Sequence, residues 1–205
     1  MYPSTEMTVR TRLIYLFFSW IPAGLIYIAG SFVRGNMWII PESSVEQLIP
    51  FSPHGIWLYL FFYIYIPYTF LTVKEGNIKR MSFAFIGSVC ISGIFFIFLP
   101  SSIVFPDFEL NGISAYFLSF VSENDTPQNC FPSIHASLIT VCTLANWDKT
   151  NKARSYGCIL LTIMMYYSII QLRRHICIDV SAGIILALLT WWLSKFGIRR
   201  FGKLR

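Results

Sequence analysis

Six apolar stretches, each close to the length of a bilayer crossing, constrain the fold of this chain more than any other feature. They cover residues 13–33, 55–73, 82–104, 133–147, 156–172 and 176–196. A bilayer core needs about 20 mostly apolar residues per helix. The composition agrees, since 55% of the 205 residues are hydrophobic and 13% are charged, against roughly a quarter charged in soluble proteins. We therefore expect one all-α integral membrane domain over 1–205, a six-transmembrane helix bundle.

The first apolar stretch follows Arg10 and Arg12, as the core of a secretory signal peptide would. It is longer than such a core, and no small-residue cleavage site follows it. We expect an uncleaved signal-anchor helix. The fourth and fifth stretches are short and polar near one end, which is typical of helix ends that line a cavity.

Basic residues indicate the orientation of the bundle. If the N-terminus is cytoplasmic, all but three of the 16 basic residues fall on the inner side. The exceptions are Arg34, Arg173 and Arg174. Basic residues accumulate in cytoplasmic loops, so we expect both termini in the cytoplasm. The inner set is Arg10, Arg12, Lys74, Lys79, Arg80, Lys149, Lys152, Arg154, Lys195, Arg199, Arg200, Lys203 and Arg205.

Two outer segments are too long to be tight turns. Residues 34–54 contain two apolar clusters and read as an interfacial helix or a re-entrant piece. Residues 105–132 form a polar, proline-containing outer loop that leads into the fourth stretch. Long ordered loops often carry function, so we expect the second segment to lead into an active site on the outer face.

Several other classes of function are disfavoured. The net charge of +6 has a sufficient cause in the cytoplasmic loops, so we expect no nucleic-acid partner. The five cysteines form no CxxC pair and have no metal-ligand spacing, and no cluster of carboxylates indicates a metal. We expect no metal and no cofactor, and the oligomeric state stays open.

Titratable residues cluster at the outer ends of three stretches. His135 lies at the start of the fourth stretch, and Arg173, Arg174 and His175 lie where the fifth ends. The two histidines are 40 residues apart, about two crossings, so the chain returns to the same face. Asp179 follows His175 by four residues and shares its helix face.

This cluster has the parts that phosphoryl transfer requires. A carboxylate that accepts a hydrogen bond from one imidazole nitrogen leaves the lone pair of the other nitrogen free to attack phosphorus. It also stabilises the positive charge that the ring gains on attack. A second histidine can protonate a leaving oxygen, and guanidinium groups match phosphate oxygens. The remaining histidine, His54, reads as a loop residue that faces headgroups. A structural His–Asp pair and arginines that merely anchor a helix end are the plainer interpretations.

The segments Cys-Phe-Pro-Ser-Ile-His at 130–135 and Arg-His-Ile-Cys-Ile-Asp at 174–179 resemble the type-2 phosphatidic acid phosphatase superfamily. The resemblance implies that His175 is the nucleophile that forms a phosphohistidine. His135 would be the general acid and then the base, Asp179 would orient His175, and Ser133 would bind the phosphoryl group.

Two arginines of that family pattern are absent here. Phe105 stands where the first motif has one, and Ile169 stands where the third motif has the other. Arg173 and Arg174, a turn nearer the histidine, look like substitutes that bind the phosphate, with Arg174 favoured because it adjoins His175. In these departures the chain is similar to short bacterial members of the superfamily that resemble inositol phosphorylceramide synthases.

We therefore expect a metal-independent lipid phosphatase or phosphotransferase. Its substrate would be a membrane phospholipid, a polyprenyl (pyro)phosphate or a lipid A-type phosphate at the periplasmic face of a bacterial inner membrane. One alternative is a head-group phosphotransferase that resembles sphingolipid synthases. A second alternative is an inactive lipid-binding or transport protein.

Overall fold

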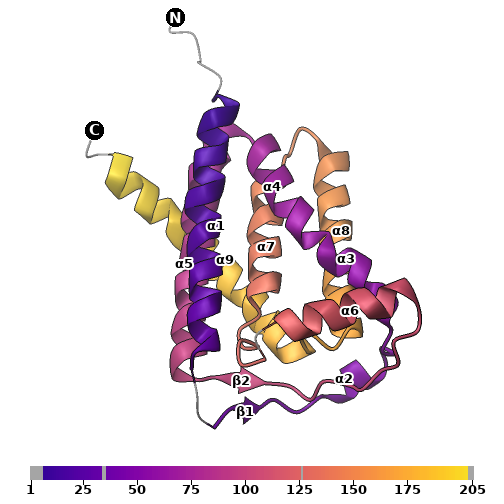
Figure 1. Ribbon diagram of the computed structural model, residues 1–205. Coiled ribbons are helices and arrows are strands. Elements are labelled where there is room, and N and C mark those ends of the chain that lie inside the picture. The colour runs from indigo at the N-terminus through magenta and orange to yellow at the C-terminus, as the bar shows by residue number, and fades with distance from the viewer. Residues whose placement is uncertain (1–6, 34–35, 126, 203–205) are drawn as a thin grey trace, which may run out of the picture.

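The computed structural model describes residues 7–33, 36–125 and 127–202, and within these ranges the chain is a bundle of helices (Figure 1). The long helices are α1 (Val9–Ser31), α5 (Glu75–Phe98), α8 (Lys152–Gln171) and α9 (Cys177–Gly202). A further segment joins η1 (Pro53–Gly55), α3 (Ile56–Leu60) and α4 (Phe62–Thr72). Among the described residues, five helical segments are long and apolar enough to cross a membrane. The chain is thus a multi-pass, mostly helical membrane protein.

The fourth apolar stretch forms a shorter helix than a simple crossing needs. Helix α7 (Ile134–Asn146) has 13 residues and is about 20 Å long, against a hydrocarbon core of about 30 Å. It packs against α4, α5, α8 and α9, and Ala136 and Ile139 are fully buried. Because α7 lies inside the bundle, its burial does not depend on lipid, and the sixth crossing stays a prediction.

The third apolar stretch begins earlier than the hydropathy pattern indicates. Helix α5 starts at Glu75, where a carboxylate in the first turn favours a helix start, and not at residue 82. The guanidinium of Arg80 lies 3.9 Å from the ring centroid of Trp191 in α9. The charged residues that we assigned to a loop are therefore the first turns of a helix that packs on α9.

The described part of the segment 34–54, residues 36–54, contains one short strand and one short helix before η1. Strand β1 (Trp38–Ile39) pairs in parallel with β2 (Ser101–Ser102), and α2 (Ser44–Gln47) follows. The capping box between Ser43 and Glu46 explains the start of α2. Arg34, one of the three basic residues expected on the outer side, lies outside the described residues.

The segment 105–132 contains a helix that the sequence analysis did not predict. Helix α6 (Gly112–Asn124) buries Ala115 and Leu118 and exposes Tyr116 and Phe120. It lies across one end of the bundle (Figure 1). We refer to this end, with α2, β1, β2 and α6, as the α6 end.

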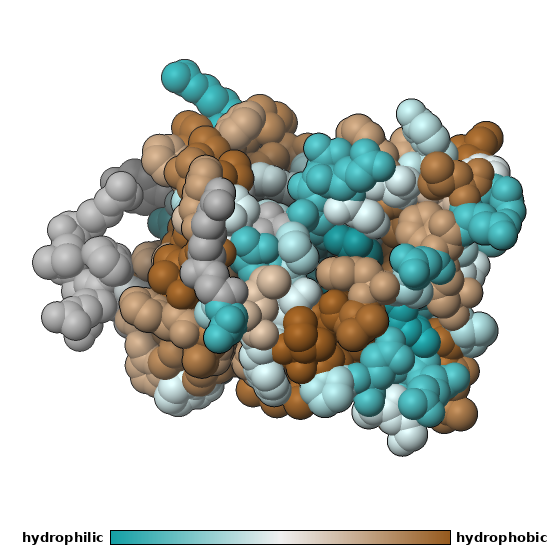
Figure 2. Space-filling model, turned by 60° about the horizontal axis from the view of Figure 1, so that its bottom comes forward, coloured by the Kyte–Doolittle hydropathy of each residue, from teal (hydrophilic) through white to brown (hydrophobic). Residues whose placement is uncertain are grey.

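Helix α1 starts and α9 ends at the opposite end of the bundle (Figure 1). Figure 2 views the α6 end and shows hydrophilic residues gathered among hydrophobic ones. The starts of α7 and α9 meet near the α6 end, where the backbone N–H of Ser133 donates to the backbone oxygen of Asp179.

Candidate active site

The starts of α7 and α9 bring three predicted site residues together. His175 Nδ1 lies 2.9 Å from Asp179 Oδ2, and His175 Nε2 lies 3.4 Å from His135 Nδ1. The second oxygen of Asp179 accepts a 2.8 Å hydrogen bond from the backbone N–H of Ile176. All three side chains are buried, and Asp179 is completely inaccessible. The two motifs therefore form one site, as the spacing of 40 residues predicts.

A fourth residue, Tyr59 in α3, completes a buried chain of hydrogen bonds. Its hydroxyl lies 3.2 Å from His135 Nε2. The carboxylate of Asp179 assigns the proton of His175 to Nδ1, so His175 Nε2 accepts from His135 Nδ1–H, and Tyr59 donates to His135 Nε2. Sequence reasoning missed Tyr59, because a tyrosine within an apolar run gives no signal of its contact 76 residues away.

Ser133 supports the site through the backbone of α7. It is the N-cap of α7, where its Oγ accepts a 3.2 Å hydrogen bond from Ala136 N–H. Its own N–H donates to the backbone oxygen of Asp179 at 3.0 Å. Gly183 in α9 permits this approach, since an added Cβ would overlap the carbonyl oxygen of Ser133. Ser133 thus joins α7 to α9 and sets the separation of the two histidines.

Arg174 points toward the α6 end of the site. It forms an ion pair with Asp125 and donates to Ser122 Oγ at 2.9 Å. Its guanidinium lies 4.8 Å from the ring centroid of Phe105, the residue that replaces an arginine of the family pattern. Its buried Nε–H has no hydrogen-bond acceptor among the described residues. Arg174 therefore carries a positive charge and has one N–H, at Nε, that is free to donate to a ligand.

Arg173 points elsewhere and is fully engaged by the protein. Its guanidinium donates to the backbone oxygens of Ile170, Glu46 and Ile49, each at 2.8 Å, and pairs with Glu42 at 2.9 Å. Its backbone is left-handed, with φ of 50°, which costs a non-glycine residue about 1 kcal/mol. These contacts hold the turn between α8 and α9.

Glu46 in α2 holds the start of α9 and was also missed by the sequence analysis. Its carboxylate accepts hydrogen bonds from the backbone N–H of Ser43 and of Cys177. Burial opposes ionisation, but the hydrogen bonds from Ser43 and Cys177 outweigh it and lower the pKa of Glu46 to about 2. The carboxylate is therefore ionised at neutral pH, and its negative charge stabilises the N-terminus of α9.

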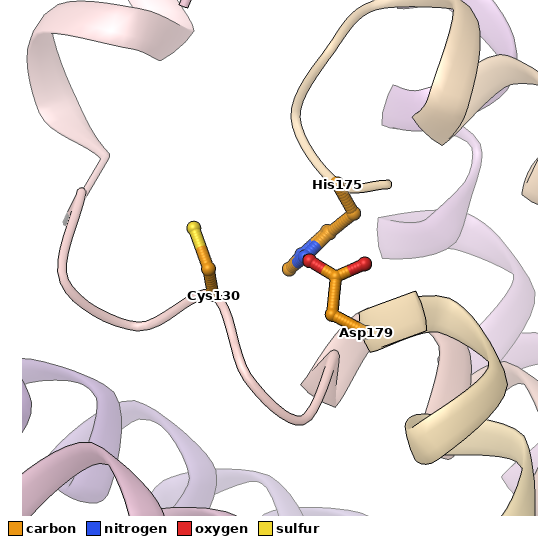
Figure 3. A group of neighbouring side chains, drawn as sticks. All are labelled: Cys130, His175 and Asp179. Carbon is orange, nitrogen blue, oxygen red and sulfur yellow. The ribbon is translucent and has the colours of Figure 1, made fainter. Parts of the chain in front are cut away.

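Three side chains form a candidate metal cluster. Ligand atoms of Cys130, His175 and Asp179 lie within 4.8 Å of one another, with Cys130 in the loop before α7 (Figure 3). Burial, followed by the charges of Asp179 and Asp125, raises the pKa of the Cys130 thiol to about 12. A metal binds the thiolate, so a metal here would have to displace the thiol proton and the hydrogen bond between His175 and Asp179.

His54 lies outside the histidine pair. Its Nδ1 is 3.1 Å from Ser114 Oγ in α6, and Trp57 donates to the same oxygen at 3.0 Å. His54 is exposed and also contacts a helix of the α6 end, and its facing of lipid headgroups stays a prediction.

A buried pair of histidines with one carboxylate and one free arginine donor is a site for histidine-based chemistry within a membrane bundle. The family model described as the PAP2 superfamily matches residues 82–201, which is more than half of the chain and includes both histidines. The chain belongs to this superfamily, and the prediction from its two motifs is confirmed. No curated protein matches the chain, and no solved structure matches it. Members of the superfamily are generally phosphatases or phosphotransferases.

Proposed function

We propose that this protein is a metal-independent lipid phosphatase or phosphotransferase that works through a phosphohistidine. The contact between His175 and His135, with Asp179 behind it, carries this proposal. The substrate would be a phospholipid, a polyprenyl (pyro)phosphate or a lipid A-type phosphate. It would react at the periplasmic face of a bacterial inner membrane.

The roles follow from the hydrogen bonds of the pair. Nε2 of His175 bears the lone pair and attacks phosphorus, while Asp179 stabilises the imidazolium that forms. As an imidazolium in the substrate complex, His135 gives a proton to the leaving oxygen, and as the neutral imidazole it later takes one from the acceptor. Since 3.4 Å is hydrogen-bond contact, the two rings must separate to admit the phosphoryl group.

Arg174 is the phosphate-binding arginine in this proposal. The carboxylate of Asp125 already pairs with it, so the site accepts an anion, and the free Nε–H can donate to a phosphate oxygen. The phosphate of the substrate is a larger anion than the carboxylate of Asp125. In the complex, the phosphate would replace that carboxylate as the partner of Arg174. Ser133 would contact the phosphoryl group as the resemblance implies, beside its role as the N-cap.

A head-group phosphotransferase is the second candidate, and burial of the site favours it. His135, His175 and Asp179 are each less than a tenth exposed. A poorly hydrated site favours a lipid alcohol over water as the acceptor in the second step. The third candidate is an inactive lipid-binding or transport protein. Such a protein would not require the buried hydrogen bonds that connect Tyr59 to Asp179 through the two histidines.

The test is turnover by the purified protein in detergent with native lipid extract. We expect release of phosphate or exchange of a head group, and a phosphoenzyme that is stable to base and labile to acid. His175→Ala should reduce turnover by at least a thousandfold and abolish the phosphoenzyme.

The matched control is His54→Ala, which removes a histidine at the same end of the bundle outside the pair. It should keep turnover within about threefold. Substantial turnover by the His175→Ala variant, with an unchanged melting temperature, would remove His175 as the nucleophile. Labelled lipid product in place of free phosphate would select the phosphotransferase.

A further inference from the structure

A cavity of about 420 Å³ lies beside the histidine pair, between α1, α3, α4, α5, α6 and α7. Apolar and aromatic side chains form most of its wall, among them Trp20, Phe62, Phe85 and Leu138. Its volume lies within the range of about 300–1,000 Å³ that is usual for ligand sites. The cavity therefore has the size and the lining of a site for an apolar ligand.

One part of the cavity is continuous with the candidate active site. His135 and Tyr59, which bond each other at 3.2 Å, both line it. Asp125, which pairs with Arg174, lines it as well. An apolar ligand in this cavity would thus have its polar end beside the general acid and the phosphate-binding arginine.

Another part of the cavity reaches the outside of the bundle. Gly24 in α1 is exposed, and the side chains of Tyr63 in α4 and Phe120 in α6 are 51% and 59% exposed. Helix α1 and the segment that contains α4 are two of the candidate membrane spans. A mouth between these two helices would therefore open toward lipid.

We propose that this cavity binds the hydrocarbon chain of the lipid phosphate, which enters sideways from the bilayer between α1 and α4. This inference rests on the proposed function, and it adds where the chain lies. The shared chemistry of the ligand is a hydrocarbon chain on a phosphate ester, and it can come from a polyprenyl or an acyl lipid.

The chemistry of the first step places the chain on this side of the phosphate. The bond from His175 Nε2 to phosphorus forms as the bond from phosphorus to the leaving oxygen breaks. His135 enters this step as an imidazolium, gives one proton to that oxygen and is left as the neutral imidazole. Because His135 lines the cavity, the chain attached to the leaving oxygen lies in the cavity, and the lipid alcohol is released there.

Gly24 offers a direct test. A Cβ added at Gly24 meets no atom within 4 Å, so Gly24→Leu fits the fold and narrows the mouth. We expect the KM for farnesyl phosphate to rise at least tenfold. The kcat/KM for p-nitrophenyl phosphate, whose leaving group is one ring, should stay within about twofold. The matched control is Gly157→Leu in α8, where an added Cβ also meets nothing within 4 Å and which does not line the cavity.

Two substrates distinguish the sources of the chain. A loss by Gly24→Leu that is confined to farnesyl phosphate indicates a polyprenyl chain, and one confined to dioctanoyl phosphatidic acid indicates an acyl chain. Equal losses indicate a cavity that takes either chain. Unchanged KM values for both substrates would overturn the proposal.

Photolabelling separates this inference from the proposed function. A farnesyl phosphate analogue with a diazirine in its chain should label peptides from α1, α4 and α7, and Gly24→Leu should reduce this labelling at least fivefold. Labelling without turnover would support the cavity and contradict the enzymatic proposal. Turnover with labelling only outside these helices would support the enzyme and refute the cavity.

Discussion

At the scale of single residues, the hydroxyl of Tyr59 matters because it is the partner of His135 on the side away from His175. A hydroxyl can donate to a neutral imidazole and accept from an imidazolium. Tyr59 can therefore hold His135 in both protonation states, and Tyr59→Phe leaves a buried nitrogen without a partner. Tyr59 is a positioning residue in this interpretation.

We expect Tyr59→Phe to lower kcat for an alkyl phosphate by about tenfold, a fraction of the 10²–10⁴ that general acid–base catalysis contributes. The loss should be smaller for an aryl phosphate, whose leaving group needs less protonation. The pH dependence of kcat should also shift. Tyr68→Phe, which removes an exposed hydroxyl from α4, is the control. A purely structural role would reduce both substrates equally and leave the pH profile unchanged.

The neighbouring arginines should separate into two roles. Arg174→Lys keeps the charge and loses the planar fork, so we expect kcat/KM to fall at least tenfold with little change in melting temperature. Arg173→Lys loses the contacts to three backbone oxygens. We expect it to lower the melting temperature and to keep turnover per folded molecule within about threefold. If Arg173→Lys lowers kcat/KM and Arg174→Lys lowers only the melting temperature, Arg173 would be the phosphate-binding arginine.

At the scale of elements, the junction of α7 and α9 decides the distance between the histidines. In Gly183→Ala the new Cβ would overlap the carbonyl oxygen of Ser133, and the start of α7 must move away from α9. Overpacking of this kind costs about 1–3 kcal/mol. The 3.4 Å contact of His135 with His175 should be lost with it.

We expect Gly183→Ala to lose more turnover than its fraction unfolded at the assay temperature explains. Thermal unfolding in detergent and turnover measured on the same sample make this comparison. Gly157→Ala in α8, where a Cβ meets no atom, should leave both unchanged. If Gly183→Ala loses stability and turnover in proportion, the junction would be a packing contact without influence on the histidines.

At the scale of the whole molecule, the α6 end should face away from the cytoplasm. Helix α1 starts and α9 ends at the opposite end (Figure 1), where Lys74 pairs with Asp148 at 2.8 Å. This arrangement fits an even number of crossings and the basic inner segments of the sequence.

A membrane-impermeant maleimide tests this orientation in intact cells. Leu110→Cys lies before α6 in an exposed position and should be labelled at once. Lys152→Cys at the start of α8 should be labelled only after the membrane is permeabilised. The natural chain, with its five cysteines, measures the background. The reverse pattern would place the site in the cytoplasm.

The sequence by itself determined the membrane class, the superfamily and the pairing of His135 with His175. These properties depend on local features: the length of apolar runs, two short motifs, and a spacing of about two crossings. The helix face shared by His175 and Asp179 follows from the α-helical repeat alone. Such features need no knowledge of which helices touch.

Only the tertiary structure decided what depends on contacts between distant segments. It placed Tyr59 behind His135, put α6 over one end of the bundle, and turned Arg174 toward the site while Arg173 met backbone oxygens. It also buried α7, which has only 13 residues, among other helices. The physical reason is that apolar residues read alike in a sequence whether they face lipid or protein, and a polar group reveals its partner only when the chain has folded.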